Sequence, residues 1–290
     1  MKKFAFKLLN FGLIGLIFVF LSLIFVFIIQ KKVNSDSQKI AGYQNLIMGD
    51  SQMQRLNSNL FPFKTKNIAS SGEHFYFTYQ KLKCIIQNKN NKVQKVVLGL
   101  SIHHFSPVYN RLFDTKFSEG QSSLKRFLYF IPISYYNEFV TLSGTSASNF
   151  IKGLFLKGAD WGGEVKSDYS NPDEKSIKNL YESHFLINQS EEKYSQSQKK
   201  YLRKIDSLCL SNDIKLITCS LPYLSLYKKK INNDYFEFYN NAVSDLKRLN
   251  HINFISEIPK SNWMSDGVHL NNDGGAIYSK KINKIITNLK

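Results

Sequence analysis

Two segments near opposite ends of the chain carry side chains that could together perform acyl transfer. Asp266 lies three residues before His269, so its carboxylate can accept the Nδ1 proton of the imidazole and leave Nε2 free to act as a base. Ser51 follows Gly49 and Asp50 directly after an apolar run, and a tight turn there would expose its hydroxyl. We therefore predict Ser51 as nucleophile, His269 as base and Asp266 as orienting acid, although Asp and Ser at such places can also simply cap a helix.

A third segment contains a glycine that could let the backbone approach a reacting group. Gly72 lies five residues after Asn67, which belongs to the next short apolar run. Without a Cβ, a glycine allows a backbone N–H to come close to a bound acyl oxygen. The alternative is an ordinary strand-to-helix turn, because isolated glycines usually mark turns. His74 nearby could line the same pocket, but a histidine at a helix start is more often solvated.

Short apolar runs alternate with longer helical patterns, which is typical of a parallel sheet with crossover helices. This predicts an α/β fold, a three-layer α/β/α sandwich with a central parallel sheet. In such sheets ligands bind beyond the carboxyl ends of the strands, where the three segments lie. The expected strands are 45–48, 67–69, 96–100, 215–219 and 253–255, and the expected helices are 75–87, 198–211, 234–249 and 274–289.

The alternation stops between about residues 103 and 190. A plain connection of that length is uncommon in a compact domain, so we expect an insertion over the site, as a lid or an acceptor-binding surface. Its Trp161-Gly162-Gly163 sequence could stack on a sugar or form a packed turn.

The N-terminal segment predicts a membrane anchor. Residues 8–29 form an apolar run that matches the length a helix needs to cross a bilayer, and no small-residue cleavage site follows. We expect residues 1–32 to be a cytoplasmic tail and a single transmembrane helix, with the polar stretch 33–42 as a tether. Residues 33–290 then form the domain, outside the cytoplasm; because the flanking lysines are nearly balanced, an inward-facing domain is the alternative.

The formal net charge of +17 does not indicate nucleic-acid binding. Only five of the 39 basic residues are Arg, the residue that supplies bidentate phosphate and base recognition. The lysines are scattered rather than clustered, and they could favour an anionic membrane surface or an acidic glycan. The three cysteines have no metal-ligand spacing, so we expect buried free thiols, with a bridge between Cys209 and Cys219 as the alternative.

With these motifs in order, the sequence resembles the SGNH/GDSL hydrolase superfamily. Its first block corresponds to Gly49-Asp50-Ser51, its second to Asn67 with Gly72, and its last to Asp266-Gly-Val-His269 before a closing helix. The likeness covers about 34–102 and 200–290 but not the insertion. It implies a flavodoxin-like SGNH fold and an oxyanion hole that includes the N–H groups of Ser51 and Gly72.

The third block of that family is absent. The family usually has Gly-x-Asn-Asp after the third strand, whose Asn side chain donates to the oxyanion. Here the chain continues from Gly99 into Leu-Ser-Ile-His-His, so Ser101, His103 or His104 would have to replace the amide, or the hole would use backbone N–H groups alone. Losing one donor typically lowers the rate on the order of a hundredfold.

The resemblance implies a serine-dependent ester hydrolase or an O-acyltransferase that forms an acyl-enzyme on Ser51, with no metal and no cofactor. Members with an N-terminal anchor and a lost third block are similar to cell-envelope acyltransferases. An acyl donor and a polysaccharide acceptor are then the expected partners, with the membrane contacted through the N-terminal helix and no nucleic acid. The alternative is a catalytically silent SGNH-fold envelope protein that binds polysaccharide or scaffolds a complex.

Overall fold

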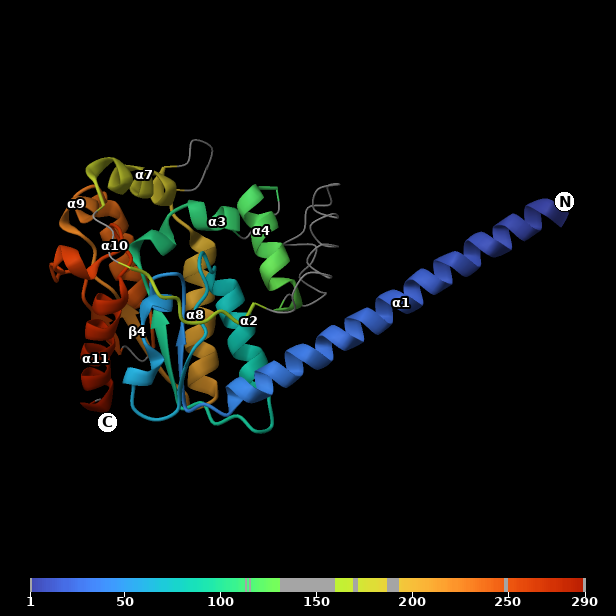
Figure 1. The fold of residues 1–290 in the computed structure, drawn as a ribbon, viewed down its shortest axis with the longest axis horizontal. Helices are drawn as coiled ribbons and strands as arrows, with labels where there is room; N and C mark the ends of the chain where they lie inside the picture. The colour runs from blue at the N-terminus through green and yellow to red at the C-terminus, as the bar shows by residue number, and fades with distance from the viewer. Residues whose placement is uncertain are drawn as a thin grey trace.

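The computed structural model describes residues 2–112, 114, 116–130, 160–168, 172–186, 193–247 and 250–288. Within them, five parallel strands form one sheet in the order β2-β1-β3-β4-β5 (Figure 1). The strands are β1 Asn45–Met48, β2 Thr65–Asn67, β3 Lys95–Gly99, β4 Lys215–Ser220 and β5 His251–Asn253. The predicted α/β class with a central parallel sheet is confirmed.

Helices connect the strands and continue past the last one. They are α1 Lys2–Ala41, α2 Phe75–Ile86, α3 Val108–Leu112, α4 Ser118–Phe127, α7 Glu174–Phe185, α8 Gln196–Ser211, α9 Ser225–Lys228, α10 Asn233–Ser244 and α11 Asn272–Asn288. Short 3₁₀ turns are η1 Met53–Arg55, η2 Ser58–Leu60, η3 Ile102–Phe105, η4 Leu128–Phe130 and η6 Ser261–Trp263.

The two faces of the sheet are covered by different helices, because successive side chains of a strand point to opposite sides. Leu46 and Met48 of β1 belong to one buried cluster, together with residues of α2 and α8. Ile47, between them, belongs to a second cluster that contains residues of α11. The result is the expected order of helix, sheet and helix, consistent with a three-layer sandwich.

Two expected strands are placed wrongly by two residues. β2 ends at Asn67, which the sequence analysis took as its first residue, and β5 ends at Asn253 in the same way. Ile68 and Phe254, the apolar residues that suggested the later positions, are buried in the connections that follow the strands. Burial therefore does not mark strand pairing at these two places.

Helix α1 projects from the domain, with its C-terminal end beside α2 (Figure 1). Within the part of the chain that the structure describes, no helix has the length and apolar character required to cross a membrane. The expected tether at 33–42 is wrong for most of its length, since α1 continues to Ala41. Val33, Ile40 and Ala41 are buried in the domain core, which holds this end of the helix.

The expected insertion at about 103–190 contains secondary structure. Helices α3, α4 and α7 lie in it, and the segment 160–168 runs over the domain in an extended path. Residues 131–159 of this region lie outside the described residues.

The cysteines are free, and no bridge joins Cys209 to Cys219. Both thiols are buried, as expected, whereas Cys84 is half-buried. Burial raises the pKa of the Cys209 thiol to about 12, so that thiol stays protonated and unreactive at neutral pH.

Candidate active site

The turn after β1 presents Ser51. Gly49 has φ +127°, and a Cβ there would lie 3.1 Å from the backbone of Gly99 in β3, so the position requires glycine. The close approach lets the chain reverse at the carboxyl end of the sheet. Asp50 then points into the core, where it is fully buried, and Ser51 is left half-buried at the edge.

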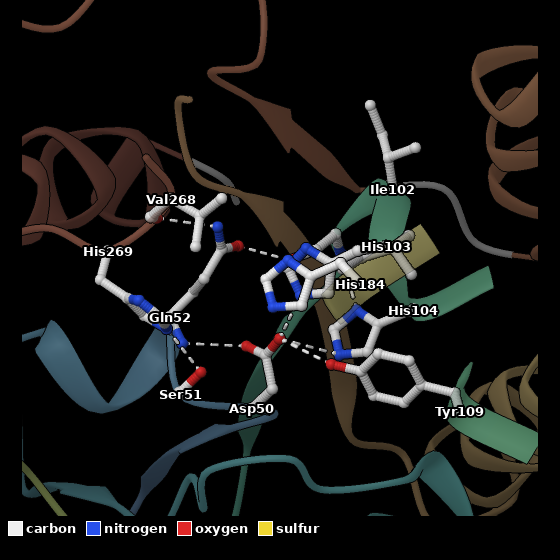
Figure 2. A network of polar contacts seen from close by, with 12 residues as sticks. Asp50, Ser51, Gln52, Ile102, His103, His104, Tyr109, His184, Val268 and His269 are labelled. Atoms are coloured by element: carbon white, nitrogen blue, oxygen red, sulfur yellow. Dashed lines mark hydrogen bonds and ion pairs between the residues drawn. The ribbon is translucent and has the colours of Figure 1, made fainter. Parts of the chain in front are cut away.

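The structure brings Ser51, His269 and Asp266 together from the two ends of the chain. Ser51 Oγ lies 2.7 Å from His269 Nε2, and His269 Nδ1 lies 2.6 Å from Asp266 Oδ2 (Figure 2 shows the Ser51–His269 contact). Because a carboxylate can only accept, Nδ1 carries the imidazole proton and Nε2 presents its lone pair to the serine hydroxyl. This is the tautomer that a general base needs.

Two backbone N–H groups of the same turn hold the Asp266 carboxylate in place. Its Oδ1 accepts the N–H groups of Val268 and His269, both at 2.8 Å. Burial by itself would raise the pKa of the Asp266 carboxyl, but the hydrogen bond from His269 and these amides together lower it. The group is therefore ionised at neutral pH and can stabilise an imidazolium.

Gly72 lies in the turn after β2 with φ +59°. Among the residues that the structure describes, no acceptor lies in hydrogen-bonding geometry with the backbone N–H of Ser51 or of Gly72. The Asn67 side chain has a structural role. Its amide donates to Met53 O at 2.8 Å and to Leu56 O at 3.0 Å, and these bonds connect the segment after Ser51 to the second motif. Within the described residues, the Ser51 and Gly72 N–H groups are therefore both left without a hydrogen-bond acceptor.

The three residues named as substitutes for the missing Asn are engaged elsewhere. The Ser101 hydroxyl donates to Gln52 Oε1, in a buried contact. His103 Nε2 lies 2.9 Å from Asp50 Oδ2, and His104 Nε2 lies 3.2 Å from the same oxygen (Figure 2). The two histidines flank Asp50, which precedes Ser51 in the sequence, and no contact in the described residues joins Ser101, His103 or His104 to Ser51.

Asp50 is a buried anionic centre that the sequence analysis missed as a functional candidate. It also accepts the Gln52 N–H at 3.1 Å and faces the Tyr109 hydroxyl at 3.4 Å. Burial would raise the pKa of its carboxyl, but His104 and His103 lower it well below its usual range. Two features of the sequence could have indicated this pairing. Asp50 directly precedes Ser51, and the adjacent His103 and His104 follow the third strand.

His184 is a second omission. Its ring stacks on His103 with centroids 4.6 Å apart, and its Nδ1 lies 2.6 Å from the Tyr227 hydroxyl. Burial, followed by the neighbouring His103, lowers the pKa of His184 well below its usual value, so His184 is neutral at pH 7. Helix α7 of the expected insertion therefore contributes directly to the layer behind Asp50 (Figure 2).

Asp50, His103 and His104 place one potential metal-ligand atom each within 4.8 Å of one another. The donor set does not fit a metal. His104 Nδ1 accepts the Ser101 N–H at 2.9 Å, so the proton of the neutral ring is on Nε2, the nitrogen that faces Asp50. A protonated nitrogen has no lone pair for an ion. We therefore read the cluster as a hydrogen bond from His103 to Asp50 with His104 Nε2 in close polar contact beside it.

His74 and Trp161 also differ from the expectations. His74 is fully buried, and its Nδ1 accepts the Tyr76 N–H at 2.9 Å as the cap of α2, so the expected solvated position is wrong. The Trp161 ring packs edge-on against the Phe130 ring, with centroids 4.7 Å apart. This contact favours the packed turn over a surface for stacking on a sugar.

No known family model and no curated protein matches this sequence. Among solved structures, the chain is similar to a protein provisionally described as a platelet activating factor from Streptococcus pneumonia. The two are 12% identical with a TM-score of 0.38, over 92% of this chain and 97% of the other. A likeness at that level carries no conclusion about activity.

Proposed function

We propose that this protein is a serine-dependent ester hydrolase or O-acyltransferase of the SGNH/GDSL type, with a covalent acyl-enzyme on Ser51. The supporting observation is the continuous path from Ser51 Oγ through His269 to Asp266, with contacts of 2.7 and 2.6 Å. Side chains more than two hundred positions apart in sequence meet in the order that nucleophilic catalysis requires.

The first half of the reaction forms the acyl-enzyme. Ser51 Oγ attacks the acyl carbonyl while His269 Nε2 takes the hydroxyl proton, and Asp266 stabilises the resulting imidazolium. The carbonyl oxygen becomes an oxyanion that the N–H groups of Ser51 and Gly72 stabilise. When the tetrahedral intermediate collapses, His269 gives its proton to the departing oxygen, and the acyl group stays on Ser51 as an ester.

The second half transfers the acyl group to an oxygen acceptor. His269 Nε2 removes a proton from water or from a sugar hydroxyl, which attacks the Ser51 ester and restores the serine. Water gives a hydrolase and a glycan hydroxyl gives a transferase. We propose an acylated cell-envelope glycan or lipid as donor and polysaccharide as acceptor in the second case.

We further propose that residues 8–29 anchor the enzyme in a membrane, with the domain outside the cytoplasm. The apolar composition of this run supports the proposal, as do exposed apolar side chains along α1 such as Phe11, Leu16 and Phe20. Extraction of cell membranes with alkaline carbonate tests it: the full chain stays with the lipid pellet if the run is inserted, and its release into the supernatant would reject the anchor.

A silent binding protein with this fold is the second candidate. The observation that favours it is that Ser101, His103 and His104, the possible substitutes for the missing Asn, all contact residues other than Ser51. A fluorophosphonate probe separates the two candidates, because it reacts only with an activated serine. Labelling of the folded full chain that disappears in Ser51→Ala supports the enzyme, and no labelling of a folded wild-type protein supports the binding protein.

A further inference from the structure

One extended segment of the expected insertion contacts all three motif segments. We call residues 160–168 the belt. Gly163 N donates to Ala69 O at 2.9 Å, Val165 N donates to Gln54 O at 2.9 Å, and Asn272 N donates to Ser167 O at 2.9 Å. Ala69 lies within the second motif, Gln54 lies just after Ser51 of the first, and Asn272 lies just after His269 of the last. The belt therefore ties together the three parts of the chain that form the site.

The start of the belt is fastened by an arginine that reaches the oxyanion turn. Arg126 Nε donates to Asp160 Oδ2 at 2.9 Å, and Arg126 Nη1 donates to Ser71 O at 2.6 Å. Asp160 Oδ1 accepts the Gly162 N–H at 2.8 Å, which closes the first turn of the belt. One guanidinium thus links the belt to the peptide before Gly72.

That contact determines where the Gly72 N–H points. The Ser71 carbonyl and the Gly72 N–H belong to the same planar trans peptide, so they point in opposite directions. Holding the Ser71 carbonyl toward Arg126 therefore directs the Gly72 N–H away from Arg126, within the same peptide plane. A donor fixed in this way needs no reorganisation during the reaction, which is the source of its effect on rate.

The belt lies directly on the turn, with no room between them. A Cβ at Gly162 would come within 2.2 Å of Ala69 O and 2.4 Å of Ser70 Oγ, and its φ of +76° also favours glycine. On the inner side, the buried Lys81 ammonium lies 2.9 Å from Ser70 Oγ and 2.6 Å from Glu73 Oε2. The turn is held from outside by the belt and from inside by Lys81.

The energetics favour a positioning effect over a contribution to stability. The Arg126 and Asp160 side chains are 33% and 32% exposed, so water screens much of their attraction and the pair contributes little to stability. Replacing Arg126 should therefore leave the fold intact. Its removal frees the Ser71–Gly72 peptide to rotate.

We propose that Arg126 is a positioning residue, which holds the Ser71–Gly72 peptide so that the Gly72 N–H serves the oxyanion. The inference rests on the proposed serine chemistry. Through Arg126 and Asp160, the expected insertion then helps to orient a donor of the oxyanion hole.

The test compares Arg126→Gln with Arg203→Gln in the full chain, using turnover of p-nitrophenyl acetate. Arg203 is a matched control, because it pairs with Asp245 at 2.5 Å on the surface away from the site. We expect Arg126→Gln to lower kcat roughly ten- to hundredfold, with KM, thermal midpoint and the shape of the pH profile unchanged. A lysine at this position can reach only one of the two acceptors, Asp160 Oδ2 or Ser71 O, so the kcat of Arg126→Lys should lie between those of wild type and Arg126→Gln. A kcat within twofold of wild type in Arg126→Gln would overturn the proposal.

Hydrogen exchange gives a second readout that needs no turnover. Residues 70–73 should exchange faster in Arg126→Gln than in wild type, and Arg203→Gln should not change them. Equal exchange in all three proteins would contradict the clamp even if the enzyme is active. If wild type lacks Ser51-dependent turnover, the proposed function fails, and the exchange result still decides whether Arg126 holds this turn.

Discussion

Gln52 Nε2 donates to the Val268 carbonyl at 2.9 Å, so the residue after Ser51 holds the turn that carries His269. Its Oε1 accepts the Ser101 hydroxyl, and the side chain is 1% exposed (Figure 2 shows the Val268 contact). One buried amide therefore links the ends of β1 and β3 to the Asp266–His269 turn. It fixes the separation between Ser51 and His269 without contacting the reacting atoms.

Replacing Gln52 with Met should loosen this link while keeping the side-chain length. We expect kcat to fall roughly ten- to hundredfold, because small displacements of catalytic groups have effects of that size. The Val268 carbonyl and Ser101 hydroxyl lose a partner, so stability should fall by about 1–3 kcal/mol. Ester turnover and urea unfolding measure the two effects. A destabilised protein with unchanged kcat would show that the link has no part in catalysis.

Replacing Asp266 with Asn should remove the acceptor that sets the His269 tautomer. In serine hydrolases of this arrangement such a change lowers kcat about 10⁴-fold, and a loss of that order is expected here. Asp173→Asn is the control, since Asp173 is an exposed cap of α7 and Asn caps helices equally well. If both variants turn over p-nitrophenyl acetate like wild type, Asp266 does not orient the base.

The cluster around Asp50 should not depend on a metal. Because His104 Nδ1 accepts the Ser101 N–H, its other nitrogen carries a proton and cannot bind an ion. Dialysis against a chelator should leave turnover and the thermal midpoint unchanged, and added Zn²⁺ should not raise the midpoint. A stoichiometric metal found by elemental analysis, with loss of stability after its removal, would replace the hydrogen-bonded assignment.

Stability should fall between about pH 6 and pH 4 because of buried histidines. Burial, with a smaller contribution from His104, lowers the pKa of His74 to about 3, and burial lowers that of His104 to about 4. In this range the unfolded chain binds these protons and the folded chain does not, so the free energy of unfolding decreases as the pH falls. Below that range Asp50, whose pKa is lowered in the fold, contributes in the same direction.

His74→Asn isolates one of these protons. Asn can still accept the Tyr76 N–H as a helix cap but does not titrate. The slope of unfolding free energy against pH should decrease by about 1.4 kcal/mol per pH unit, the value for one proton. Urea unfolding at several pH values measures it. An unchanged slope would mean that His74 is not kept neutral by the fold.

The sheet and the meeting of Ser51, His269 and Asp266 could be anticipated from the sequence because they depend on local patterns. A short apolar run before a Gly-Asp-Ser turn predicts a strand end, and a carboxylate three residues before a histidine predicts their contact. In the structure β1 ends at Met48, just before Gly49, and His269 Nδ1 lies 2.6 Å from Asp266 Oδ2. The two segments then meet where Ser51 Oγ lies 2.7 Å from His269 Nε2.

The contacts around Ser51, His269 and Asp266 could not be predicted from local sequence patterns. The pairing of Asp50 with His103 and His104 depends on how β1 and β3 align, and the stacking of His184 depends on where α7 returns to the domain. Arg126 and Gly162 lie in a region with no family pattern, and their contacts with the Ser71–Gly72 turn exist only in three dimensions. The buried contacts of Ser101, His103 and His104, which the sequence offered as possible substitutes for the missing Asn, depend on the tertiary fold in the same way.

Acylation of Ser51 is the most direct test of the central claim. The full chain would be mixed with a fluorophosphonate and digested, and the modified peptide identified by mass spectrometry. We predict a single adduct on Ser51 that is lost in Ser51→Ala and strongly slowed in His269→Ala, with both variants folded. A folded wild-type protein that forms no adduct, or an adduct that persists in Ser51→Ala, would contradict the account.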